Sequence, residues 1–109
     1  MKIFFSDYQA DEHVPPDESR EVSLKEAVAE FEALCDEEGC FFGLIDDKER
    51  VVQFMYNEDG RLLIDVPLPE KQGSLKRDSA TFEECRQIII DSEVGIRVEA
   101  IPDLKFEPW

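Results

Sequence analysis

Two segments of the chain carry the same helix-start signature, and this pair of signals constrains the fold more than any other feature. Ser23 is followed three residues later by Glu26, and Thr81 is followed three residues later by Glu84. In such a capping box the hydroxyl accepts from the backbone N–H of the acid, and the carboxylate accepts from the N–H of the hydroxyl residue. A helix is therefore expected to begin directly after each hydroxyl residue.

Apolar residues continue at helical spacing after both caps. Gly39 supplies a left-handed stop for the first helix, and Gly95 follows the second. The spacing predicts helices over residues 24–38 and about 82–92. The apolar positions are Leu24, Ala27, Val28, Phe31, Leu34 and Cys35 in the first helix, and Phe82, Cys85, Ile88 and Ile89 in the second.

Short apolar or alternating runs outside the helices predict strands. The three central runs are separated by turn sequences and are expected to form an antiparallel meander. Pro67 and Pro69 cannot donate ladder hydrogen bonds, so the end of the third central strand is expected at a sheet edge or outside the sheet. The predicted strands span residues 2–6, 40–46, 50–57, 61–69 and 96–101.

The element order β-α-β-β-β-α-β predicts an α+β fold, a single two-layer domain over residues 1–109. Both helices are expected on the apolar face of a mostly antiparallel, five-stranded sheet. The chain is 42% hydrophobic and contains eight Phe, which is enough for one core. The acidic segment 7–22 and the polar segment 70–80 are expected to be loops, and the tail 102–109 is expected to be irregular.

The net charge of −15 narrows the classes of partner. Direct binding to nucleic acid or to an anionic membrane needs clustered Lys and Arg, so neither is expected, whereas a basic protein partner is favoured. No apolar run approaches the roughly 18–20 residues of a membrane span, and the N-terminus lacks the features of a signal peptide. A cytoplasmic location is expected.

Three cysteines make an odd count, unlike a secreted disulfide scaffold. Cys35 and Cys85 fall on apolar helix faces, so the cysteines are expected to be small buried side chains in a reducing compartment. Cys35 and Cys40 have no second thiol pair to complete a tetrahedral metal site. Residues 7–18 resemble a calcium loop only in their acids, because they lack the required glycine. No metal and no cofactor is therefore expected.

The segment 7–22 and the helix after it concentrate acidic residues, which has two interpretations. The acids present an electrostatic surface for a basic partner, or they are a solvated connection. Under the first interpretation, Tyr8 is an aromatic anchor and carboxylates provide the contacts. The candidate partner-binding residues are Tyr8, Asp11, Glu12, Asp17, Glu18, Glu21, Glu37 and Glu38. Basic residues cluster only at Lys71, Lys76 and Arg77.

The layout of the first helix, the meander "CFFGLIDDKERVVQFMYNEDGRLLIDVPLP" and the capped helix "TFEECRQIII" resembles small acidic immunity proteins of bacterial polymorphic toxin systems, in their Imm1-type form. The resemblance covers residues 20–101 in layout and composition, and it carries over no individual residue. It implies a non-enzymatic protein that neutralises a basic toxin acting on nucleic acid, by occluding the toxin's substrate groove.

Two alternatives remain open from the sequence. In the first, the chain is a structural or regulatory homo-oligomeric subunit, such as a dimer, that pairs through a sheet edge at 61–66 or 96–101. Otherwise it is a small enzyme that uses His13, the only histidine, or Cys40.

Overall fold

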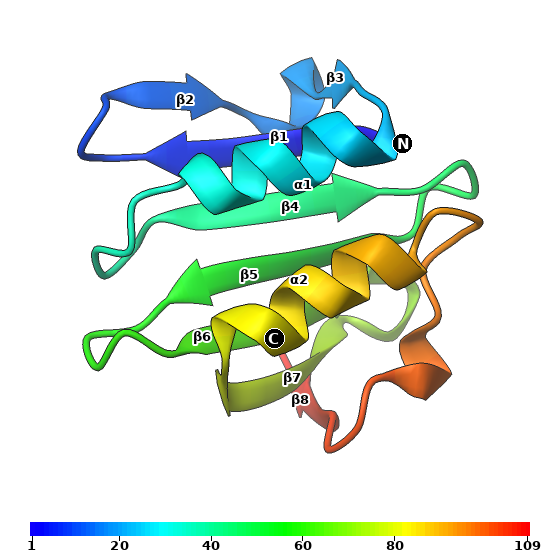
Figure 1. Ribbon diagram of the computed structural model, residues 1–109. Coiled ribbons are helices and arrows are strands. Elements are labelled where there is room, and N and C mark those ends of the chain that lie inside the picture. Colours follow the sequence, from blue (N-terminus) through cyan, green and yellow to red (C-terminus); the bar gives the residue numbers. More distant parts are fainter.

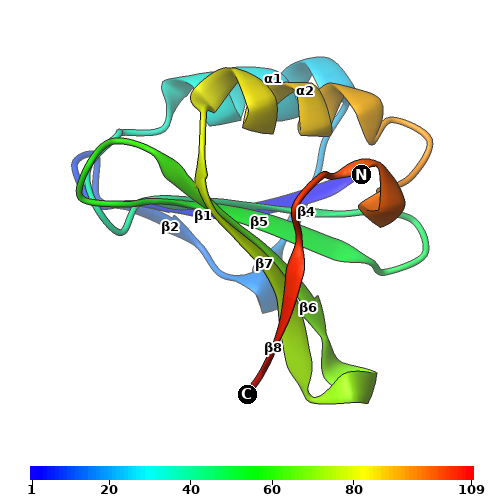
Figure 2. The same ribbon diagram turned by 90° about the horizontal axis from the view of Figure 1, so that it is seen from below.

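A computed structural model describes all 109 residues as one α+β unit with two helices and one antiparallel sheet. The helices are α1 (Leu24–Ala33) and α2 (Phe82–Asp91), and they lie side by side on one face of the sheet (Figure 1; Figure 2). The two-layer α+β class is confirmed. The five-strand description is not, because the sheet has eight strands.

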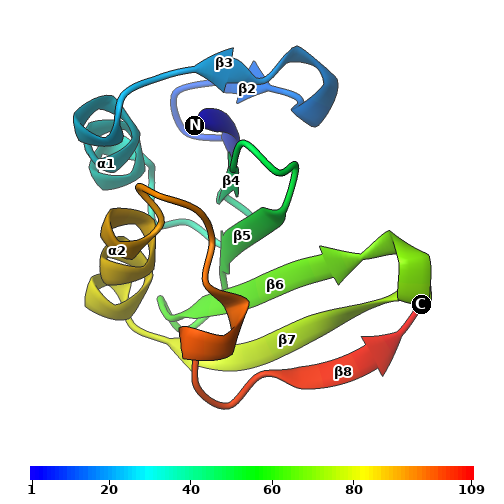
Figure 3. The ribbon, with the colours of Figure 1, turned by 90° about the vertical axis from the view of Figure 1, so that its right-hand side faces the viewer.

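The strands follow the order β2-β1-β4-β5-β6-β7-β8, and β3 also pairs with β1. All the pairings are antiparallel. Figure 3 shows the sheet edge-on, with both helices on one side and β6, β7 and β8 extending away from them on the other. The strands are β1 (Lys2–Asp7), β2 (Glu12–Val14), β3 (Arg20–Glu21), β4 (Phe41–Ile45), β5 (Val51–Tyr56), β6 (Leu62–Leu68), β7 (Gly73–Ala80) and β8 (Lys105–Pro108).

Both predicted capping boxes are confirmed. The hydroxyls of Ser23 and Thr81 each accept from the backbone N–H of the acid three residues on, and each acid returns a hydrogen bond to the cap N–H, all at 3.1 Å. The first helix ends at Ala33, five residues before the predicted end at 38. Leu34 is already extended, because the next N–H binds the carboxylate of Asp7 on another strand.

The core lies between the helices and the sheet. Phe31 of α1 sits at its centre, stacked on Phe82 of α2 with ring centroids 5.1 Å apart. It also contacts the rings of Phe42 on β4 and Phe54 on β5. The alternate residues of β4, β5 and β6 face this layer, as the strand patterns predict.

The acidic segment 7–22 was wrongly predicted to be a loop. It folds back along β1 as β2, a 3₁₀ turn (η1, Pro16–Glu18) and β3. Phe5 pairs with Val14 and Lys2 pairs with Glu21, so the segment satisfies backbone groups that a free β1 edge would leave unpaired. Val14 is its one buried apolar side chain after β1, which is why no alternation signalled the strands.

The C-terminal third holds three further corrections. The predicted loop 70–80 contains a 3₁₀ turn (η2, Pro69–Lys71) and β7, and the predicted strand 96–101 is a 3₁₀ turn (η3, Val98–Ala100). The tail 102–109, predicted to be irregular, contains β8, which pairs with β7. Polar strands such as β7 are defined by pairing with both neighbours rather than by their own pattern.

The strand β6 lies between β5 and β7, but its proline end pairs with β7 alone, so Pro67 stands at a local edge as predicted. Pro67 pairs with Ser74 of β7, although pairing with β5 stops at Asp65. Both predicted dimer edges, 61–66 and 96–101, are therefore wrong. No helix of the structure is long and apolar enough to cross a membrane.

Candidate functional site

The predicted partner-binding residues divide between the two ends of β1 instead of forming one patch. Glu12 pairs with Asp7 at the C-terminal end of β1, whereas Glu21 pairs with Lys2 at its N-terminal end. All the predicted side chains are exposed. One group contains Tyr8, Asp11 and Glu12, with Glu37 and Glu38 beside them in the turn after α1; the other contains Asp17, Glu18 and Glu21.

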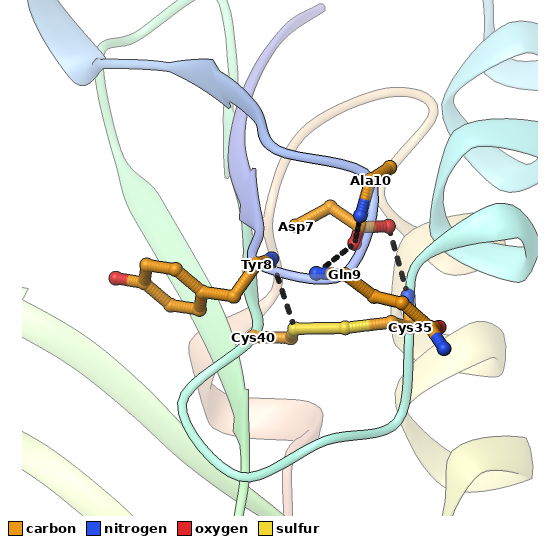
Figure 4. Close-up of a disulfide and its surroundings, with 6 residues drawn as sticks. All are labelled: Asp7, Tyr8, Gln9, Ala10, Cys35 and Cys40. Carbon is orange, nitrogen blue, oxygen red and sulfur yellow. Dashed lines mark hydrogen bonds between the residues drawn. A yellow bond between two sulfur atoms is a disulfide. The ribbon is translucent and has the colours of Figure 1, made fainter.

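The Tyr8 end is fixed by a buried carboxylate and a disulfide (Figure 4). One oxygen of Asp7 accepts from the backbone N–H groups of Gln9 (3.0 Å) and Ala10 (2.9 Å), and the other accepts from Cys35 N (3.1 Å). The backbone N–H of Tyr8 points at Cys40 Sγ, 3.4 Å away. The Tyr8 ring points away from the disulfide in Figure 4 and is 57% exposed, so it is available to a partner.

The carboxyl group of Asp7 is held in its charged form. The hydrogen bond from Ala10 N is the largest influence and lowers the pKa below its usual value of 3.8. Burial opposes this change, and the bonds from Cys35 and Gln9 add to the lowering. Asp7 therefore has a structural role, as the acceptor that joins the end of β1 to the end of α1.

Cys35 and Cys40 are joined in a disulfide, which corrects the prediction that they are separate buried thiols. A cytoplasmic location stays a prediction, and reducing conditions there would open this bond. Asp7 and the two sulfur atoms lie within 4.8 Å of one another. Metal binding needs deprotonated thiols, however, and both sulfurs are bonded while both Asp7 oxygens accept backbone N–H groups.

For the alternative of a small enzyme that uses His13 or Cys40, the structure shows Cys40 in a disulfide rather than as a free thiol nucleophile. Burial raises the pKa of the remaining thiol, Cys85, to about 12, so it is a poor nucleophile as well. His13 is exposed, with its Nε2 3.1 Å from Asp11 Oδ1 and its ring beside Tyr8. This is a surface pair rather than a nucleophile–base pair.

The Asp17 end opens into a groove of about 500 Å³ between the η1–β3 segment and the β4–β5 turn. We call it the acidic groove. Lys2 is its one basic lining residue. No sequence pattern marks the carboxylates of the β4–β5 turn as part of this site, because only the fold brings them beside residues 17–21. The acids that line it are Asp17, Glu21, Asp46, Asp47 and Glu49.

Asp46 is buried at the end of this groove and serves the fold. Its Oδ1 accepts from Lys48 N and Arg50 N, and its Oδ2 accepts from Arg50 Nε and Ile96 N. Burial raises the pKa of Asp46, but the hydrogen bonds from Ile96, Arg50 and Lys48 together lower it by more, to below its usual 3.8. No such hydrogen-bond donors contact the other carboxylates Asp17, Asp47 and Glu49, so their negative charges stay uncompensated in the groove.

The negative charge of the chain is mostly uncompensated within the molecule. Only five of the 27 carboxylates lie within 4.0 Å of a cationic group or of His13. Two of the five acids that line the acidic groove form ion pairs: Glu21 with the N-terminal amino group at 2.8 Å, and Asp46 with Arg50 at 2.9 Å. A groove lined by one sign of charge concentrates its field and speeds association with a surface of opposite sign.

The basic cluster predicted at 71–77 does not form one patch. Lys76 and Arg77 are consecutive on β7, so their side chains point to opposite faces of the sheet. Arg77 forms an ion pair with Glu84 of α2, on the helix side. The acidic character of the molecule is therefore not balanced by a basic surface in this segment.

The sheet face opposite the helices carries a second feature that the sequence analysis missed. A hollow of about 140 Å³ opens there, lined by residues of β4, β5 and β6. We call it the sheet hollow. Its lining residues are Phe41, Gln53, Phe54, Met55, Leu63 and Asp65.

Comparison of the chain with protein-family models, with curated proteins and with solved structures finds no match in any of the three.

Proposed function

We propose that this chain is a non-enzymatic binding protein that neutralises a basic enzyme, such as a toxin that acts on nucleic acid, in the manner of an immunity protein. The observation that carries the proposal is the acidic groove, where carboxylates from two separate segments line one opening. An enzyme that binds nucleic acid presents clustered Lys and Arg to phosphates. The groove carboxylates stand in for those phosphates and cover that surface.

The position of the unpaired carboxylates supports a binding function for the segment 7–22 rather than a role as a solvated connection. The segment 7–22 is paired to β1 and holds Asp17 and Glu21 facing the β4–β5 turn, rather than dispersing them in solvent. Fixed charges of one sign raise association rates by about 10–10³-fold, and they lose this effect as salt is added. Binding that is fast at low salt and slows with added salt is therefore expected.

The homo-oligomer alternative has weaker support. The strands now at the sheet edges are β2 and β3 on one side and β8 on the other, and each has four residues or fewer. Short edges that carry charged residues and Pro108 are poor templates for pairing with another chain. Sedimentation of the purified protein should show a monomer at micromolar concentration.

The test is capture of a partner from a lysate of the native host, at low and then at high salt. The tagged chain should retain one basic protein in near-equal amount and release it as salt rises. The variant Asp17→Lys/Glu18→Lys/Glu21→Lys should slow association with that protein about 10-fold or more at low salt. The control Glu58→Lys/Glu93→Lys/Glu99→Lys has the same net charge and changes exposed acids outside the groove. Equal binding by the two variants would contradict the role of the groove.

A further inference from the structure

The sheet hollow lies on two rows of cross-strand neighbours on the face away from the helices. Phe41, Met55 and Leu63 pair across β4, β5 and β6 and form the first row. Gly43, Gln53 and Asp65 form the second. Met55 is 38% exposed, which is unusual for a large apolar side chain in the middle of a sheet. No helix or loop covers this part of the sheet in Figure 3.

One wall of the hollow is fixed by a close contact that depends on glycine. The ring of Phe4, on β1, lies over Gly43, where an added Cβ would come 1.9 Å from Phe4 Cζ. The same ring meets Phe41 edge-on, with the centroids 6.3 Å apart. Phe41 is thereby held in place beside the opening. The volume of 140 Å³ is close to the ~150 Å³ of a cavity that takes up benzene, so one long side chain fits.

Asp65 is the one charged residue that lines the sheet hollow, and it determines which kind of ligand the hollow can bind. Its Oδ1 is the only buried side-chain oxygen or nitrogen in the chain without a hydrogen-bond partner. Lys76 is the register neighbour of Asp65 on β7, yet the two do not approach within the 4.0 Å of an ion pair. A buried acceptor without a donor is costly, and native structures contain few of them. A donor that enters the hollow would satisfy this oxygen after the Asp65 side chain turns to expose it.

We propose that the sheet hollow binds an arginine side chain of a basic protein partner, with the Asp65 carboxylate as its counter-ion. The apolar walls suit the methylene stem of the arginine, and the planar guanidinium matches a carboxylate with two parallel hydrogen bonds. The net charge of −15 favours a cationic occupant. Arginine is preferred over lysine because its charged group is more weakly hydrated and keeps its fixed fork geometry.

The hollow and the acidic groove lie on the same sheet face. Ile45 and Val51 line the groove, and each is two residues along its strand from Gly43 or Gln53, so all four side-chain positions face the same way. One partner surface can therefore face both the groove and the hollow. The inference rests on the proposed function in naming a basic protein as the source of the arginine, and it adds where and how that protein is anchored.

The test uses the full chain and a defined probe, the peptide acetyl-Leu-Arg-Leu-amide, followed by ¹⁵N–¹H NMR titration. The same peptide with citrulline in place of arginine keeps the shape and removes the charge. The arginine peptide should cause saturable shifts at the amides of Gln53, Met55 and Asp65, and the citrulline peptide should bind about 10-fold more weakly or worse. The substitution Asp65→Asn should remove this preference, and the control Asp78→Asn, at an exposed acid of β7, should keep it.

Thermal melting separates a binding role of Asp65 from a structural one. If its carboxylate is unpaired in the free protein, Asp65→Asn should leave the melting temperature unchanged or raise it. A fall of more than about 4 °C would make Asp65 a structural residue and overturn the proposal. Equal affinity for both peptides, shifts confined to the acidic groove, or no saturable shift would also overturn it.

This titration needs no natural partner, so its failure is distinct from that of the proposed function. If the arginine peptide does not bind at Asp65, but the groove variant still fails to bind the captured protein, only the assignment of Asp65 as the arginine site is wrong. If the peptide binds at Asp65 but no basic protein is captured from the lysate, only the proposed neutralisation of a basic enzyme is wrong.

Discussion

Replacement of the buried Asp46 by alanine should destabilise the protein more than replacement of any exposed acid in a turn. The side chain joins the β4–β5 turn to the segment after α2 through its two oxygens, which accept from Lys48 N, Arg50 N, Arg50 Nε and Ile96 N. Ile96 is fully buried, so solvent does not readily replace the oxygen that its N–H loses.

The magnitude follows from these donors. An unsatisfied buried N–H costs about 1–3 kcal/mol, and the N–H groups of the exposed turn cost less because water replaces part of each bond. The ion pair with the half-exposed Arg50 adds at most about 1 kcal/mol. We expect Asp46→Ala to lower the free energy of unfolding by about 2–4 kcal/mol, a large share of the roughly 5–15 kcal/mol of a typical domain.

Urea unfolding at neutral pH, followed by circular dichroism, measures this loss as a shift of the midpoint at an unchanged slope. The matched control is Asp47→Ala, an exposed neighbour in the same turn, which should change stability by no more than about 0.5 kcal/mol. A loss below about 1 kcal/mol for Asp46→Ala, or equal losses for the two variants, would refute the assignment of Asp46 as the latch between these segments.

Three further predictions concern the two acids with lowered pKa values, the disulfide and Gly43. The pKa values of Asp7 and Asp46 lie below their usual 3.8. The stability that these two acids contribute is therefore complete above about pH 4 and is lost as the pH falls through the lowered pKa values. In an acid titration, the stability of Asp46→Asn should fall less steeply than that of the wild type. The disulfide Cys35–Cys40 closes a loop with a sequence separation of 5, so its reduction should lower the free energy of unfolding by about 2 kcal/mol, measured by unfolding with and without reductant. The unfolded, unreduced protein should contain one titratable thiol, Cys85. Three reactive thiols would contradict the disulfide. Gly43→Ala should cost about 1–3 kcal/mol in thermal melting because its Cβ would collide with the Phe4 ring, and a smaller residue at position 4 should recover part of that loss.

The sequence predicted the elements whose signals are local. The capping boxes at Ser23 and Thr81 depend on residues three apart, and both are confirmed. The β4–β5–β6 meander alternates or is continuously apolar, and its strands match the structure within two residues at each end. These elements also build the core, which is why the α+β class and the placement of both helices on one face could be predicted.

The elements that sequence reasoning missed are defined by distant partners. The strand β7 has a polar sequence and is held between β6 and β8. All four residues of β8 are exposed, and β8 is held by β7 alone. Alternation at 96–101 predicted a strand, but Ile96 and Ile101 reach the core from either side of a 3₁₀ turn. The end of α1 could not be predicted at Ala33, because Asp7 determines it from another strand.

The candidate site shows the same division between local and distant information. The sequence identified Asp17 and Glu21 by their acidic surroundings, and they lie in the acidic groove. It could not join them to Asp47 and Glu49, which only the β1–β4 pairing brings near. It also could not identify Asp65, because an unpaired buried oxygen is a property of packing and leaves no pattern in the sequence.

The most direct test of the central claim is a titration of the captured basic protein's activity on nucleic acid with this chain. Activity should fall to the background level at one chain per enzyme, and the variant Asp17→Lys/Glu18→Lys/Glu21→Lys should need a large excess at low salt to do the same. Full activity in the presence of excess wild-type chain would contradict neutralisation by this protein.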